Sequence, residues 1–95
     1  MRKYETMFIL STDFSRDQIT ETVERFKAII TNNGGQIDKA VEWGKRRLAY
    51  EVKKQREGFY VLINFTAEPG VEKELERVFN INEGVIRYLI IRLEE

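Results

Sequence analysis

The chain has 95 residues, a formal net charge of zero, and neither cysteine nor histidine. Without cysteine it can form no disulfide, thiolate nucleophile or Cys-ligated metal site, and without histidine it lacks the commonest general base. We therefore expect residues 1–95 to form one non-catalytic domain without a metal, cofactor or small-molecule substrate. No apolar run approaches the roughly 18 residues of a membrane helix, so we expect a cytoplasmic protein with no membrane partner.

A strand and a helix are predicted at the start of the chain. Residues 4–10 mix β-branched, aromatic and apolar side chains, and they stop at the polar run Ser11-Thr12-Asp13. Ser15 and Gln18 have the spacing of a capping box, which predicts that the helix begins there. Gly34 would provide a left-handed cap at its end. The apolar stripe of this helix consists of Ile19, Val23, Phe26 and Ile30.

From Gln36 onward the apolar residues recur with a period of two, which predicts a second strand. They fall into two sets of opposite parity: Ile37, Val41 and Trp43, then Leu48, Tyr50 and Val52. Because Gly44 lies between the sets, we expect a bulge there that lets both sets face one core.

The second half of the chain continues with a strand, a helix and a strand. Residues 53–58 are a basic connection and residues 59–67 a third strand, so a hairpin with a cationic tip is predicted. A second helix begins at about Val71 and a fourth strand covers residues 85–93. This order predicts an α+β fold of the ferredoxin-like, split βαβ type. Its four-stranded antiparallel sheet has the order 4-1-3-2, with both helices on one face.

One face of this sheet would have no helix over it. Side chains alternate between the two faces of a strand, so inward-facing Phe8 and Val61, for example, leave their neighbours outward. The outward apolar set is Met7, Ile9, Tyr60, Leu62, Leu89 and Ile91. A contiguous exposed patch is typical of an interaction site, so we assign these residues to a partner-protein face. The alternative is that one strand is wrongly phased and these residues belong to the core.

Residues 39–56 carry seven cations and two acids, a net charge of +5 in a neutral chain. Cations mixed with aromatics on extended structure favour RNA as a ligand. Cations on an edge strand also discourage edge pairing, which explains a few of them but not +5. Arg2, Lys3 and Arg87 are expected to join this surface near one edge of the sheet. The predicted RNA-binding set is Arg2, Lys3, Lys45, Arg46, Arg47, Lys53, Lys54, Arg56 and Arg87.

Three other functions compete with this interpretation. Residues 56–61 approach the RNA-recognition-motif signature, but Tyr60 replaces a small residue and Val61 replaces a base-stacking aromatic. An acylphosphatase-like enzyme would need a glycine-rich anion loop where this chain has Ser11-Thr12-Asp13. A homodimeric regulatory domain would cover the apolar face but leave the +5 segment without a role.

The run Gly44-Lys45-Arg46-Arg47-Leu48-Ala49-Tyr50, followed by Gly58-Phe59-Tyr60, resembles the signature of the bacterial small-ribosomal-subunit protein S-six family. The opening Met1-Arg2-Lys3-Tyr4-Glu5 is similar too, and the resemblance extends over essentially the whole chain. It implies a ribonucleoprotein role in translation: binding of small-subunit ribosomal RNA in the central domain, as a heterodimer with ribosomal protein S-eighteen. The positions that match the family's basic RNA-facing residues are Arg2, Arg46, Arg47, Lys54 and Arg87.

Overall fold

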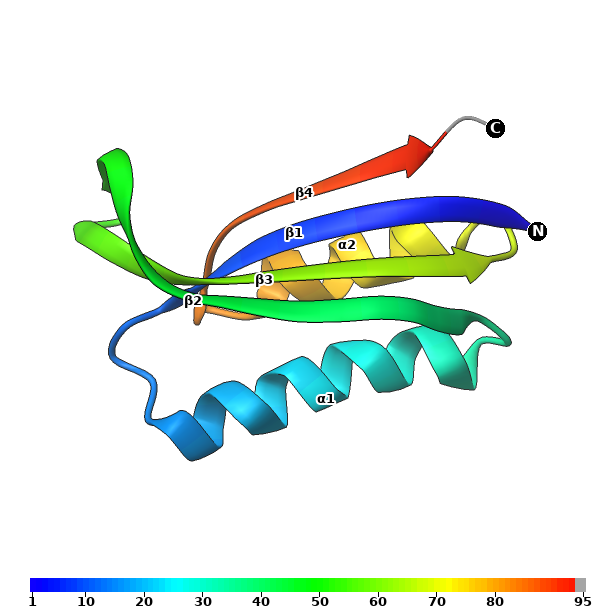
Figure 1. Cartoon of the computed structure of the whole chain (residues 1–95), viewed down its shortest axis with the longest axis horizontal. Coiled ribbons are helices and arrows are strands. Elements are labelled where there is room, and N and C mark those ends of the chain that lie inside the picture. Colours follow the sequence, from blue (N-terminus) through cyan, green and yellow to red (C-terminus); the bar gives the residue numbers. More distant parts are fainter. Residues whose placement is uncertain (94–95) are drawn as a thin grey trace.

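The computed structural model describes residues 1–93; Glu94 and Glu95, which follow the last predicted strand, lie outside the described residues. Its elements are β1 (Arg2–Ser11), α1 (Arg16–Asn32), β2 (Gln36–Val52), β3 (Gln55–Ala67), α2 (Val71–Ile81) and β4 (Val85–Leu93). The strands form one antiparallel sheet in the order β2-β3-β1-β4, which confirms the predicted fold. Both helices lie on the same side of it (Figure 1). No helix within residues 1–93 is long and apolar enough to cross a membrane.

The ends of α1 are set by the residues that the sequence singles out. Ser15 Oγ accepts a hydrogen bond from the Gln18 backbone N–H at 3.2 Å, and Gln18 Oε1 accepts from the Ser15 N–H at 2.8 Å. At the other end Gly34 has φ +83°, and the Gly35 N–H donates to the Ile30 carbonyl at 2.8 Å. This is a Schellman-type end, which needs the left-handed conformation that glycine adopts without strain.

The core lies between the helices and the covered face of the sheet. At its centre are three buried rings: Phe8 of β1, Phe26 of α1 and Phe79 of α2. Their centroids lie 5.0 Å apart for Phe8 and Phe26, 5.2 Å for Phe8 and Phe79, and 4.7 Å for Phe26 and Phe79. Each such pair contributes about 0.5–1.5 kcal/mol beyond its buried area, so this cluster fixes both helices to the sheet.

The bulge predicted at Gly44 is confirmed. The pairing of β2 with β3 slips between Glu42 and Gly44, and Gly44 has φ +87°. A bulge increases the local bend and twist of a strand. Beyond this position β2 curves away from the main sheet together with the start of β3 (Figure 1).

The prediction that both apolar sets of β2 face one core is wrong. Ile37 packs against the core, but a second slip just after it places Val41 opposite Leu62 on the uncovered side. Trp43 and Tyr50 are 41% and 61% exposed. An extra residue reverses the face of every side chain that follows it, so the shared parity of Ile37 and Val41 does not give them the same face.

The connection between β2 and β3 is shorter than the predicted residues 53–58. The turn consists of Lys53 and Lys54 alone, with φ 49° and 64°, and Val52 pairs with Gln55 across it. Two consecutive positive φ angles are typical of a type I′ hairpin turn, which glycine and asparagine favour. The polar residues after the turn are extended because they pair with β2, for example Glu57 with Arg47.

Candidate RNA and partner-protein surfaces

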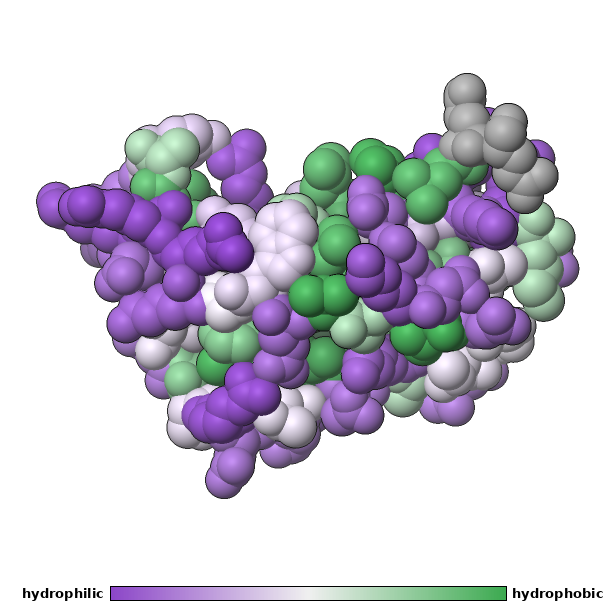
Figure 2. Space-filling view, viewed as in Figure 1, coloured by the Kyte–Doolittle hydropathy of each residue, from purple (hydrophilic) through white to green (hydrophobic). Residues whose placement is uncertain are grey.

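Apolar side chains form a row across the uncovered face of the sheet. Met7 of β1 lies opposite Leu62 of β3 on one side and Leu89 of β4 on the other, and Val41 of β2 extends the row beyond Leu62. Leu89 is 58% exposed. In Figure 2 hydrophobic side chains gather across the middle of this face.

The alternative of a wrongly phased strand is wrong, because the neighbours of the outward residues pack against the core. In β4 these neighbours are Tyr88 and Ile90, which leaves Leu89 and Ile91 outward. The outward apolar set of the sequence prediction, namely Met7, Ile9, Tyr60, Leu62, Leu89 and Ile91, therefore lies on the uncovered face.

Polar side chains that sequence reasoning did not assign also lie on this face. Asn64 of β3 lies opposite Glu5 of β1 and opposite Lys39 of β2. Its Oδ1 is buried and has no hydrogen-bond partner within residues 1–93. A buried acceptor without a donor costs roughly 1–3 kcal/mol, so this position favours a donor from another molecule. Alternation along β3 from Leu62 would have placed Asn64 on this face, but only the structure shows that its Oδ1 is buried without a partner in the described chain.

A pocket of about 190 Å³ opens on the same face between β1 and β4. Met7, Ile9, Tyr88 and Leu89 line it with mostly apolar atoms, and Arg87 supplies its charged margin. The dimensions suit a few apolar side-chain atoms better than a cofactor.

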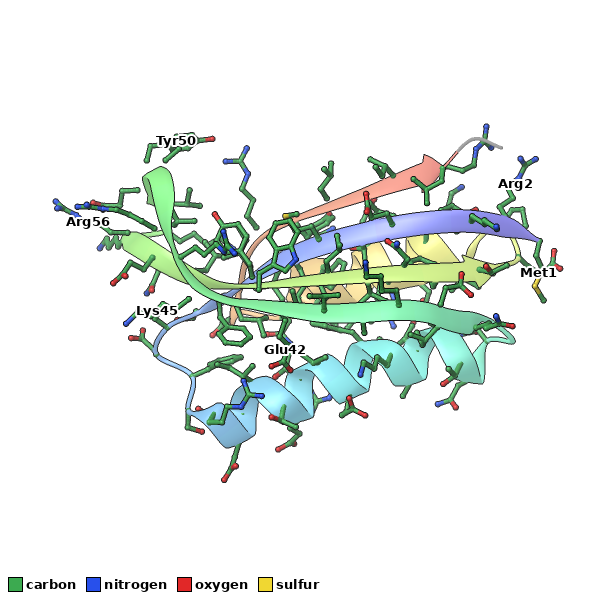
Figure 3. All side chains as sticks on the ribbon, in the orientation of Figure 1. Met1, Arg2, Glu42, Lys45, Tyr50 and Arg56 are labelled. Carbon is green, nitrogen blue, oxygen red and sulfur yellow. The ribbon has the colours of Figure 1, made fainter. Side chains whose placement is uncertain are left out.

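The basic hairpin, which we define as residues 45–56, extends from the end of the sheet where β2 and β3 meet. Figure 3 shows Lys45, Tyr50 and Arg56 together at this end. Two of its cations have acidic neighbours: Lys45 Nζ lies 3.9 Å from Glu57, and Arg56 Nε lies 3.6 Å from Glu51. Within the described chain the other cations of the hairpin form no ion pair; they are Arg46, Arg47, Lys53 and Lys54, and all four are exposed.

An exposed aromatic residue lies at the base of the basic hairpin. The guanidinium of Arg46 lies over the ring of Trp43, 5.4 Å from its centroid. This cation–π contact keeps the charge at the surface while it restricts the side chain. On the helix side of the sheet, by contrast, Glu42 is bound by Arg16 of α1 at 2.8 Å. The acids of this segment thus lie toward the helix or pair within the hairpin, and unpaired positive charge remains.

The predicted convergence of Arg2, Lys3 and Arg87 is wrong in part. Arg2 and Lys3 lie opposite Ala67 and Thr66, at the end of the sheet far from the basic hairpin (Figure 3). Because β1 and β4 are adjacent, Arg2, Lys3 and Arg87 lie near the same edge of the sheet. The two strands are antiparallel, however, so residues at their starts lie at opposite ends of that edge. Arg87 does join the hairpin, because it lies opposite Ile9 where β4 begins.

Arg87 is held by Tyr50 of the basic hairpin. Its Nη1 donates a hydrogen bond to the Tyr50 hydroxyl, and its guanidinium lies 5.5 Å from the centroid of the Tyr50 ring. The hydrogen bond to Tyr50 raises the pKa of Arg87 above its ordinary value. Across the part of the chain that the structure describes, no cluster of three or more acidic side chains could hold a metal ion.

Known proteins resemble this chain over its full length. A family model described as Ribosomal protein S6 matches residues 3–92. "Small ribosomal subunit protein bS6" of Thermoanaerobacter pseudethanolicus is 55% identical over 95 residues, which is all of both chains. The protein of the same name from Caldanaerobacter subterraneus subsp. tengcongensis is 52% identical over the same span. The crystal structure of 30S ribosomal protein S6 from Thermotoga maritima has a TM-score of 0.93 at 36% identity, covering 97% of this chain and 87% of that one.

Proposed function

This chain belongs to the ribosomal protein S6 family, and we propose that it binds small-subunit ribosomal RNA through the basic hairpin and ribosomal protein S-eighteen through the uncovered sheet face. As a family member it is a structural protein of the small ribosomal subunit, in the cytoplasmic ribosomes of bacteria. The family is one of ribosomal structural proteins and not one of enzymes.

The unpaired charge of the basic hairpin carries the RNA half of the proposal. Arg46, Arg47, Lys53 and Lys54 are exposed and form no ion pair within residues 1–93, although the whole chain is neutral. Cations gathered on one projection attract phosphates and release their counterions, which gives salt-dependent binding. Because residues 39–56 carry +5 in a neutral chain, the residues outside this segment total −5, and RNA is expected to approach from the hairpin end.

Contacts to the RNA backbone suit this surface better than stacking of bases. On the central strands the outward residues include Met7 and Leu62 rather than a pair of aromatic rings. Phosphate contacts fix the register of a protein on RNA but carry no sequence information. We therefore attribute specificity to the shape of the RNA and to the partner protein.

The uncovered face supports the partner half of the proposal. Leu89, Met7, Leu62 and Val41 form one apolar row, and Asn64 Oδ1, which has no hydrogen-bond partner within residues 1–93, lies on the same face. An apolar centre beside a hydrogen-bond acceptor that lacks a donor in the described chain is typical of a protein–protein interface. In the homodimeric alternative the basic hairpin would have no role.

The double change Arg46→Ala and Arg47→Ala tests the RNA half. We expect weaker binding to a small-subunit rRNA fragment, in the presence of S-eighteen, and a log Kd against log salt slope that is flatter by about 1–2. Fluorescence anisotropy across a series of salt concentrations measures this slope.

A matched control removes two exposed arginines from the helices, Arg25→Ala and Arg77→Ala. It changes the net charge by the same amount but lies on the opposite side of the sheet, so its slope should equal that of the unmodified protein. Equal flattening by both double variants would mean that net charge, and not the basic hairpin, governs binding.

A further inference from the structure

The outer part of the basic hairpin has few contacts of its own to keep it in place. Arg47 pairs with Glu57, and Val52 pairs with Gln55. Between these two pairs β2 has four residues but β3 has only one, so the strands cannot pair regularly here. This irregular ribbon extends beyond the two other strands, and a two-stranded ribbon by itself is only marginally stable in water. Its turn residues, Lys53 and Lys54, also adopt positive φ angles that are unfavourable for side chains of their kind.

Contacts from other elements fix the hairpin instead. Beside the turn, Gln55 accepts a hydrogen bond from Thr12 at 3.1 Å and donates one to Asp13 at 3.4 Å, both in the loop after β1. At the turn, Lys53 Nζ donates to the Val85 carbonyl of β4 at 3.3 Å. The contact of Arg87 with Tyr50 reaches the irregular stretch of β2 between Arg47 and Val52.

Arg87 lies between the hairpin and the uncovered face of the sheet. Arg87 lies opposite Ile9, whose side chain is on the uncovered face, and it lines the pocket there together with Met7 and Leu89. The guanidinium also contacts Tyr50 of the hairpin, so this one side chain touches both the hairpin and the uncovered face. In Figure 2 the surface is notched between the hairpin and the apolar side chains of the sheet.

We propose that Arg87 is a positioning residue: through Tyr50 it holds the basic hairpin bent toward the uncovered face, so that the cations of the hairpin and the apolar row are presented to one assembly. This role replaces the phosphate contact that the sequence predicts for Arg87. The guanidinium uses one N–H on the Tyr50 hydroxyl and one face on the Tyr50 ring. The effect on RNA binding rests on the proposed function, whereas the effect on the hairpin itself does not.

Amide hydrogen exchange of the free protein tests the positioning role without RNA. Tyr50→Leu and Arg87→Lys both keep the net charge, and Tyr50 is exposed enough to be replaced without loss of the fold. We expect protection of the amides of residues 46–56 to fall by about 5- to 30-fold in each variant, the factor expected for loss of a cation–π contact and a charged hydrogen bond. Protection in β1 should not change.

Arg92→Lys is the control, because it makes the same substitution on the same strand at a site far from the hairpin. Its exchange should match that of the unmodified protein throughout residues 46–56. If Tyr50→Leu and Arg87→Lys also retain full protection, the positioning role is overturned.

Binding to the rRNA fragment with S-eighteen separates this inference from the proposed function. A positioning residue predicts that Tyr50→Leu lowers affinity by about 3- to 10-fold with the salt slope unchanged, since no phosphate contact is lost. If Arg87 instead contacts an RNA phosphate directly, Tyr50→Leu should bind RNA with normal affinity. That result would contradict the positioning role in RNA binding. Loss of protection with unchanged RNA affinity would show that Arg87 holds the hairpin in place but that RNA binding does not depend on this position.

Discussion

Phe79→Ala should lower the free energy of unfolding by about 3–5 kcal/mol. The Phe79 side chain is 2% exposed, and its ring contacts those of Phe8, Phe26 and Tyr88, with centroids 4.7–5.2 Å away. Truncation therefore removes buried area and leaves a cavity between both helices and the sheet. Urea unfolding followed by far-ultraviolet circular dichroism measures the loss.

Ile81→Ala is the control for this prediction. Ile81 ends the same helix but is 66% exposed, so its truncation should change the free energy of unfolding by less than about 0.5 kcal/mol. A loss below about 1 kcal/mol for Phe79→Ala would show that the aromatic cluster does not organise the core.

Leu62→Ser combined with Leu89→Ser is expected to weaken binding of S-eighteen by about 30-fold or more. Both leucines flank Met7 in the apolar row, and removing apolar anchors from the centre of an interface commonly costs about 2 kcal/mol or more. Isothermal titration calorimetry with purified S-eighteen gives the affinity, and circular dichroism shows whether the variant is folded.

Ile81→Ser provides the comparison for the partner face. It makes an apolar to polar change at an exposed residue on the helix side of the sheet, where no partner is proposed. Its affinity for S-eighteen should not change. If a folded Leu62 and Leu89 double variant also keeps full affinity, S-eighteen binds elsewhere.

The parts of the fold that depend on local chemistry can be predicted from the sequence. Ser15 and Gln18 form the capping box because their spacing alone allows the reciprocal hydrogen bonds. Gly34 and Gly44 adopt positive φ angles that few other residues tolerate. The strand order follows from the order of the elements and the handedness of their connections.

The faces of β1, β3 and β4 could also be predicted, because alternation is unbroken over most of their length. In β2 alternation fails: neither the slip after Ile37 nor the slip between Arg47 and Val52 has a glycine or proline to mark it. Val41 was therefore placed on the wrong face. A bulge that no glycine or proline marks arises from tertiary packing, and the periodicity of the sequence cannot reveal it.

The candidate RNA surface could be predicted in composition but not in arrangement. The excess charge of residues 39–56 identifies the basic hairpin, yet only the structure separates the cations that form an ion pair, such as Lys45, from those that form none within residues 1–93, such as Arg47. The contact between Arg87 and Tyr50 joins residues 37 positions apart in the chain. No local pattern marks such a pair.

Titration of a central-domain rRNA fragment with this protein, in the absence and in the presence of S-eighteen, tests the two-surface proposal most directly. The neutral net charge and a single basic hairpin predict weak binding by the protein alone, and the partner on the uncovered face should tighten it by at least about 10-fold. Equally tight binding with and without S-eighteen would contradict the proposal.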